Sequence, residues 1–114
     1  LGGMFDVLHG LVHPVLLPAV MRFNLSACTD KMAVIGEIFL GRKRRSARAT
    51  AEAGIDRLEA YCQSLGVPTQ LREILPEREK LPDLCRMAVK DVCLLTNPKP
   101  ATWEDLLQIC ERAW

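Results

Sequence analysis

The chain has 114 residues, the length of one domain, and a chain of this size buries roughly two-thirds of its unfolded surface. Hydrophobic residues make up 49% and charged residues 25%, which excludes a disordered tail, a collagen-like repeat and a small disulfide-stabilised scaffold. A net charge of +1 provides no overall field for binding nucleic acid or an anionic membrane. The length also excludes an oxidoreductase that carries its own nucleotide-binding domain.

The first residues are typical of the interior of a longer protein. Leu1 stands where an initiator methionine would, no secretory signal precedes the first apolar stretch, and prolines interrupt that stretch before it could span a membrane. The five cysteines are widely spaced and form no C-x-x-C pair: Cys28, Cys62, Cys85, Cys93 and Cys110. This usage predicts free, mostly buried thiols in a cytoplasmic protein and no zinc ribbon.

Apolar residues at three- and four-residue spacing predict a first helix over 9–24, in which Pro18 is expected to cause a bend. A second helix is expected from a cap at Ser26 or Thr29 to Gly41. Its predicted apolar stripe consists of Met32, Ile35, Phe39 and Leu40.

The charged run 42–45 is expected to connect the second helix to a third, which Ser46 would cap and Gly66 would end. The predicted buried face of this third helix consists of Ala49, Ala53, Ile55, Leu58 and Cys62.

The capping and helix-breaking residues in the rest of the chain predict three more helices. Thr69 would cap a short helix over 71–75, and a helix over 81–92 would bury Leu84, Cys85, Ala88 and Val92. The segment 97–100 predicts a turn, and Thr102 with Asp105 predicts a capping box for a last helix that reaches Trp114. Strand signals are nearly absent. The sequence therefore predicts one all-α domain, a multi-helix bundle over 1–114.

The only histidines are His9 and His13, and their spacing places both imidazoles on one helix face. This spacing suits a pair of metal ligands, but by itself it more often marks two polar groups that bond to backbone or water. A metal ion usually takes three or four protein ligands, and no further histidine or cysteine pair supplies them. A metal bound through His9 would therefore need ligands from outside this chain.

The segment 1–24 resembles the metal-site signature of the iron-containing alcohol dehydrogenases, with His9 and Gly10 in its His-Gly step. Residues 65–73 are similar to the middle turn of that family, and residues 91–114 are similar to its closing segment. The three matches occur in the family's order and span essentially the whole chain.

The resemblance implies the C-terminal helical domain of the dehydroquinate-synthase-like type. In these enzymes it pairs with an N-terminal α/β domain that binds NAD or NADP, which this chain lacks. Members hold Fe²⁺, sometimes Zn²⁺, with one aspartate and three histidines, and His9 matches the last of these histidines. The family transfers hydride between a small-molecule alcohol, aldehyde or ketone and NAD(P), and the full-length enzymes are expected to be homo-oligomers. Isolated, this domain is expected to be inactive and to bind no cofactor tightly.

Three positions depart from the family pattern. Leu8 stands where a proline usually precedes the His-Gly step, and Ala19 stands where many members have histidine. His13 usually matches asparagine in the alcohol dehydrogenases but histidine in the related maleylacetate reductases, which share the Leu-Gly-Gly-x-Phe start. His13 and Cys93 are therefore expected in the substrate pocket, although each is also compatible with a purely structural role.

Two alternatives remain open at this stage. One is a fragment of a maleylacetate-reductase-like enzyme. The other is a free-standing helical interaction module that uses the basic patch Arg42–Arg45, with Arg48, to bind an acidic partner or nucleic acid. Against the module, no recognition helix or aromatic stacking platform adjoins the patch, because Trp103 and Trp114 lie on the last predicted helix. If the protein is not retained on a DNA column at low salt, nucleic-acid binding is excluded.

Overall fold

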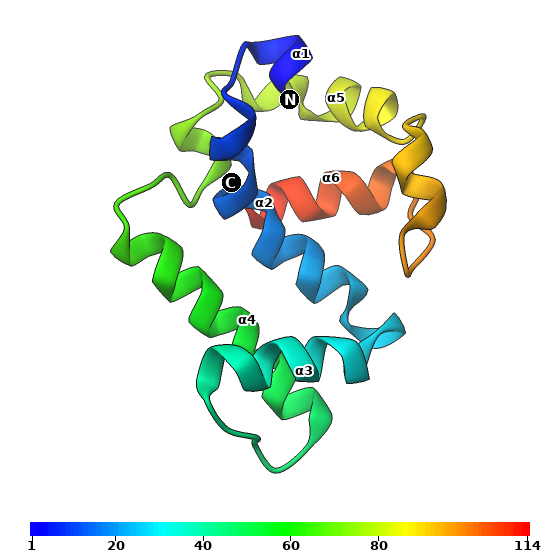
Figure 1. The fold of residues 1–114 in the computed structure, drawn as a ribbon. Coiled ribbons are helices and arrows are strands. Elements are labelled where there is room, and N and C mark those ends of the chain that lie inside the picture. Colours follow the sequence, from blue (N-terminus) through cyan, green and yellow to red (C-terminus); the bar gives the residue numbers. More distant parts are fainter.

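The computed structural model describes residues 1–114 and confirms an all-helical fold without strands (Figure 1). The α-helices are α1 (Gly2–Phe5), α2 (His9–Asn24), α3 (Thr29–Leu40), α4 (Ala47–Ser64), α5 (Leu81–Ala88) and α6 (Trp103–Arg112). Short 3-10 turns are η1 (Leu25–Ala27), η2 (Leu71–Glu73), η3 (Arg78–Lys80) and η4 (Val92–Thr96). None of the helices is long and apolar enough to cross a membrane.

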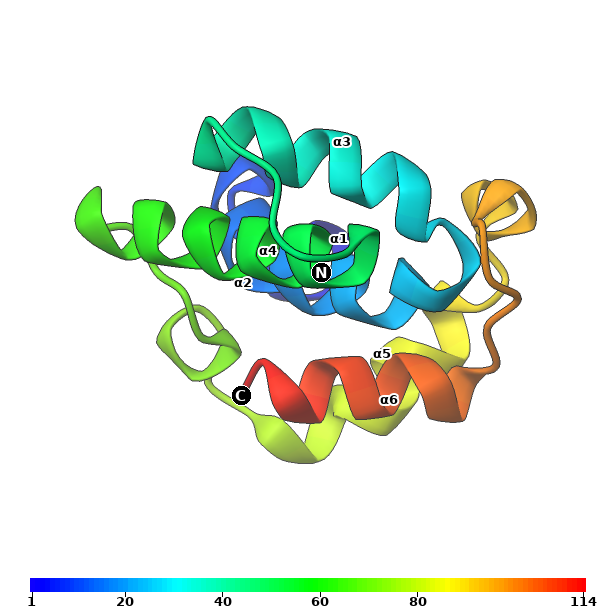
Figure 2. The same ribbon diagram turned by 90° about the horizontal axis from the view of Figure 1, so that it is seen from below.

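Helix α2 is the central element of the arrangement. It contacts α4 on one side and α6 on the other, so it lies between the α3–α4 pair and the α5–α6 pair (Figure 2). Arg22 of α2 pairs with two carboxylates of α4, Asp56 at 2.9 Å and Glu59 at 2.8 Å. The helix runs as one element through Pro14 and Pro18, so neither proline ends it.

The main core lies where α2, α5 and α6 meet the segment that carries η2. Its eight buried residues are Val15, Leu71, Leu75, Leu81, Leu84, Cys85, Cys110 and Ala113. The backbone N–H of Leu71 donates to the Ala113 carbonyl at 2.7 Å, which fixes the end of α6 against η2. Arg78 and Glu111 form an ion pair across the same region.

Helices α3 and α4 cross at two glycines, a contact that the sequence analysis missed. A methyl group added to Gly54 would overlap the Cα of Gly36, and one added to Gly36 would overlap the carbonyl oxygen of Thr50. This close approach requires small residues at the crossing, and three of the four buried residues of α4 are small: Thr50, Ala51 and Gly54, with Ile55 as the fourth. Of the face predicted for this helix, only Ile55 is fully buried.

Several predicted helix ends are confirmed. The Ser46 hydroxyl accepts a hydrogen bond from the Ala49 N–H, and α3 ends at Gly41, whose φ of 68° is left-handed. At the start of α6, Thr102 and Asp105 bond each other's backbone N–H groups at 2.9 and 3.3 Å, which confirms the predicted capping box.

Other predicted boundaries are wrong. The helix expected over 81–92 ends at Ala88, because the Asp91 carboxylate accepts from the Cys93 N–H and begins η4 instead. Val92 is consequently exposed rather than buried. The predicted cap at Thr69 falls one residue early, since Gln70 caps η2, which is a 3-10 turn and not an α-helix.

The expected apolar stripe of α3 is also not buried. Ile35 and Phe39 are 39% and 41% exposed, and Gly36 is the one buried residue of this helix. Helix α1 was not predicted, because its two glycines have low helix propensity.

Candidate metal centre

His9 is the first residue of α2 and its imidazole is exposed. Leu8 precedes it with a non-helical ψ of 123° and supplies no side-chain cap, and the first turn of the helix contains no acidic residue. Gly10 follows with open space around its Cα, which leaves the backbone beside His9 accessible. These residues present an imidazole, a good ligand for divalent iron or zinc, at an uncovered helix end.

His13 lies one turn further along α2 and is exposed as well. Its Nε2 is 3.2 Å from the Nε2 of His9, and the two rings meet edge to face with their centroids 4.7 Å apart. The structure thus brings the two predicted histidines together. No group of three or more histidine, cysteine, aspartate or glutamate side chains in the chain could enclose a metal ion.

An apolar pocket of about 300 Å³ adjoins His9. Helix α2 contributes Val12, Leu16 and Val20 to its wall, and the opposite wall comes from α5 and α6. Ten of its twelve lining residues are hydrophobic, and His9 at its edge is the one lining residue with an imidazole, so the rest of the pocket suits a hydrocarbon group better than an ion.

Two buried thiols form part of the wall contributed by α5 and α6. The Sγ atoms of Cys85 and Cys110 are 3.9 Å apart. Burial raises the pKa of Cys85 above its usual value and raises the pKa of Cys110 to about 12. Both groups are therefore neutral thiols at physiological pH and add to the apolar character of the pocket.

Cys93 does not line the pocket beside His9. It lies exposed on η4, and its backbone N–H donates to the Asp91 carboxylate at 2.8 Å. The same carboxylate raises the pKa of the Cys93 thiol by hydrogen bonding and by its negative charge. The expectation that most cysteines are buried is wrong: Cys85 and Cys110 are buried, but Cys28 and Cys62 are half-buried.

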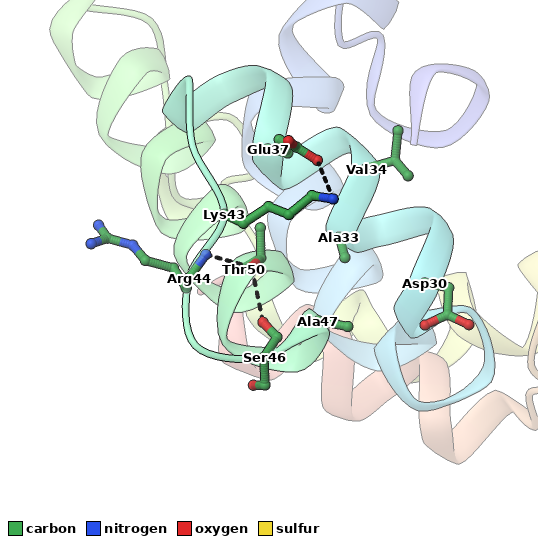
Figure 3. A pocket seen from close by; sticks show the side chains of 9 residues that line it. All are labelled: Asp30, Ala33, Val34, Glu37, Lys43, Arg44, Ser46, Ala47 and Thr50. Atoms are coloured by element: carbon green, nitrogen blue, oxygen red, sulfur yellow. Dashed lines mark hydrogen bonds and ion pairs between the residues drawn. The ribbon is translucent and has the colours of Figure 1, made fainter.

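The basic patch Arg42–Arg45 forms the connection between α3 and α4, as predicted. It borders a second pocket of about 290 Å³ (Figure 3). The Lys43 Nζ lies 3.7 Å from Glu37 Oε2 across this second pocket, while the Arg44 side chain points away from the pocket. The Arg44 backbone N–H donates to the Thr50 hydroxyl at 2.9 Å. Because Asp30 and Glu37 also line this second pocket, it does not form a basic binding site for an anion.

The comparisons with known proteins agree with this arrangement. The profile described as "Fe-containing alcohol dehydrogenase family, C-terminal" matches residues 1–114. The chain belongs to the iron-containing alcohol dehydrogenase family. It is 37% identical over 114 residues to the NAD-dependent methanol dehydrogenase of Bacillus methanolicus. The matched region is 98% of this chain and 30% of that protein.

Two further relatives match this chain over the same share of their own length. Lactaldehyde reductase of Escherichia coli K12 is 32% identical and covers 100% of this chain and 30% of that protein. The crystal structure of a 1,3-propanediol oxidoreductase superposes with a TM-score of 0.91 at 31% identity, over 99% of this chain and 30% of that chain. The chain thus spans about 30% of the length of these relatives.

The structure shows two features of this alcohol dehydrogenase domain that the sequence analysis missed, namely the apolar pocket and the thiol pair in its wall. Both are assembled from helices that are distant in sequence, so no local pattern predicts them. The position of His9 at a helix start beside Gly10 was the one local signal for this region.

Proposed function

We propose that this chain forms the metal- and substrate-side part of an NAD(P)-dependent alcohol dehydrogenase and that an N-terminal nucleotide-binding domain completes the site. The observation that carries this proposal is the exposed imidazole of His9 at the start of α2, in a chain that belongs to this family. The similarity to the NAD-dependent methanol dehydrogenase of Bacillus methanolicus supports a nicotinamide cofactor.

The residues present fit a divalent metal ion. His9 offers an imidazole nitrogen at an open helix end, and its Nε2 has only His13 as a hydrogen-bond partner, so a metal ion would replace a single exposed hydrogen bond. When bound, Fe²⁺ or Zn²⁺ polarises the oxygen of an alcohol or carbonyl group. His9 holds its share of the coordination, and the remaining ligands come from outside this chain.

The apolar pocket beside His9 would receive the carbon skeleton of the substrate. The aliphatic side chains and neutral thiols of its wall offer water few hydrogen-bond partners. Excluding water strengthens the electrostatic interactions made at the reacting oxygen. We place His13 at the rim of this site and Cys93 on a separate segment that reaches the substrate only in the assembled enzyme. A cytoplasmic homo-oligomer is the form we propose for that enzyme.

A chimera tests this function. Residues 1–114 would replace the matching region of the 1,3-propanediol oxidoreductase, whose fold they share. We expect the chimera to catalyse alcohol-dependent reduction of NAD(P) and the 114-residue chain alone to show none. His9→Ala should lower the activity of the chimera at least a hundredfold, while Gly3→Ala, in open space on α1, should leave it unchanged. Full activity with His9→Ala would contradict the proposal.

A further inference from the structure

The two histidines of α2 are spaced as two ligands of one metal ion would be. An imidazole nitrogen lies about 2.0–2.1 Å from a bound transition-metal ion. Two such nitrogens are therefore about 2.9 Å apart when they subtend a right angle at the metal and about 3.4 Å apart at the tetrahedral angle. The Nε2 atoms of His9 and His13 are 3.2 Å apart, which lies within this interval.

The helix itself maintains this separation. Residues four apart lie on the same face of an α-helix, and α2 continues without interruption for more than two turns beyond His13. Both rings are exposed, so a small rotation of either side chain directs both nitrogens at one point without disturbing the core. In the metal-free chain the two imidazoles hydrogen-bond to each other, which keeps them in neighbouring positions.

We propose that His9 and His13 together chelate a divalent transition-metal ion, so that this chain contributes two ligands rather than one. This inference rests on the proposed metal site at His9 and adds His13, which lies outside the ligand set that the family resemblance implies. The ligand class is a borderline cation that prefers imidazole, such as Zn²⁺, Ni²⁺ or Co²⁺. Water completes the coordination in the 114-residue chain, because no third protein ligand is grouped with the pair.

One effect opposes binding. The N-terminal end of a helix carries partial positive charge, and the first turn of α2 contains no acidic residue to offset it. This effect weakens the binding of a cation by roughly two- to fivefold. The chelate overcomes it because the second imidazole binds without a further loss of translational freedom. The site is accordingly weaker than one with three or four protein ligands.

Zinc titration of the 114-residue chain, followed by NMR of the histidine ring protons and by calorimetry, tests the chelate. The chain has only two histidines, so each ring signal is assigned by one variant. We expect both rings to shift together with a stoichiometry of one zinc per chain. His13→Ala and His9→Ala should each weaken binding about tenfold or more, since each leaves one imidazole.

Thiols are the competing ligands, and a matched variant controls for them. Cys93→Ala removes the exposed thiol and should leave the affinity within twofold of the wild type. Co²⁺ should bind without the near-ultraviolet absorption of a cobalt–thiolate bond. An unchanged affinity in His13→Ala with a loss in His9→Ala would overturn the chelate and leave the proposed function standing. An unchanged affinity in both variants would overturn the chelate too, and the chimera would then decide the role of His9 separately.

Discussion

The buried Cys110 thiol should lower the stability of the domain at alkaline pH. Its pKa is raised by burial to about 12, from a usual value near 9. Above pH 9 the unfolded chain releases this proton while the folded chain retains it, so rising pH favours the unfolded state. The free energy of unfolding should fall by about 1.4 kcal/mol per pH unit between these two values, with a similar direction for Cys85.

Urea unfolding at pH 8 and pH 10 measures this dependence. The wild type should lose about 1 kcal/mol or more over that interval, in addition to what other groups contribute. Cys110→Ala should show a smaller loss, although it starts from a lower stability, because the titrating group is gone. Cys62→Ala, which removes a half-buried thiol outside the pair, should retain the wild-type dependence. Equal pH dependence in Cys110→Ala and the wild type would contradict the assignment.

A second residue-scale contact joins α2 to the segment before α6. The side-chain amides of Asn24 and Asn97 donate to each other's carbonyl oxygens at 2.9 and 2.8 Å, and Asn24 is 5% exposed. Asn24→Ala removes both of these hydrogen bonds and leaves the half-buried Asn97 amide with only its bond to the Lys99 carbonyl, so it should cost about 1–3 kcal/mol of unfolding free energy. In a double-mutant cycle with Asn97→Ala, the double variant should cost less than the sum of the single variants. Strict additivity would show that the pair contributes no coupling.

At the scale of elements, the crossing of α3 and α4 leaves no room for an added methyl group. Gly54→Ala places a methyl group against the Cα of Gly36, and backbone atoms cannot move aside as a flexible side chain can. We expect a loss of about 1–3 kcal/mol or more in thermal or urea unfolding. Gly10→Ala is the matched control, because it adds the same methyl group to a helix in open space and should be neutral or slightly stabilising. Equal effects of the two substitutions would refute the close crossing.

The elements also show which features local sequence predicts. Caps such as Ser46 and the Thr102–Asp105 box are short-range, so the sequence alone located them. The end of α5 was misplaced because Val92 has a helix-compatible spacing, whereas the Asp91 side chain competes for the backbone N–H of Cys93. The Gly36–Gly54 crossing depends on two helices at once, and neither glycine signals its partner.

At the scale of the whole molecule, the all-α class followed from helical spacing and the near absence of strand signals, and the family followed from three ordered segments that span the chain. The same segments led to His9 as a metal ligand and to His13 as a substrate-pocket residue, and the structure places their Nε2 atoms 3.2 Å apart. The pocket beside them was not predictable, since α2, α5 and α6 meet there from distant parts of the sequence. The chain covers about 30% of each relative, and the proposed metal site needs ligands that these residues do not supply.

The metal content of the purified chimera tests the central claim, that His9 is a metal ligand of an alcohol dehydrogenase, most directly. After expression with iron or zinc, elemental analysis should find about one metal ion per chimeric chain, and His9→Ala should reduce this to a small fraction at unchanged helix content by circular dichroism. One tightly bound metal ion per chain in His9→Ala, with wild-type affinity, would contradict the claim.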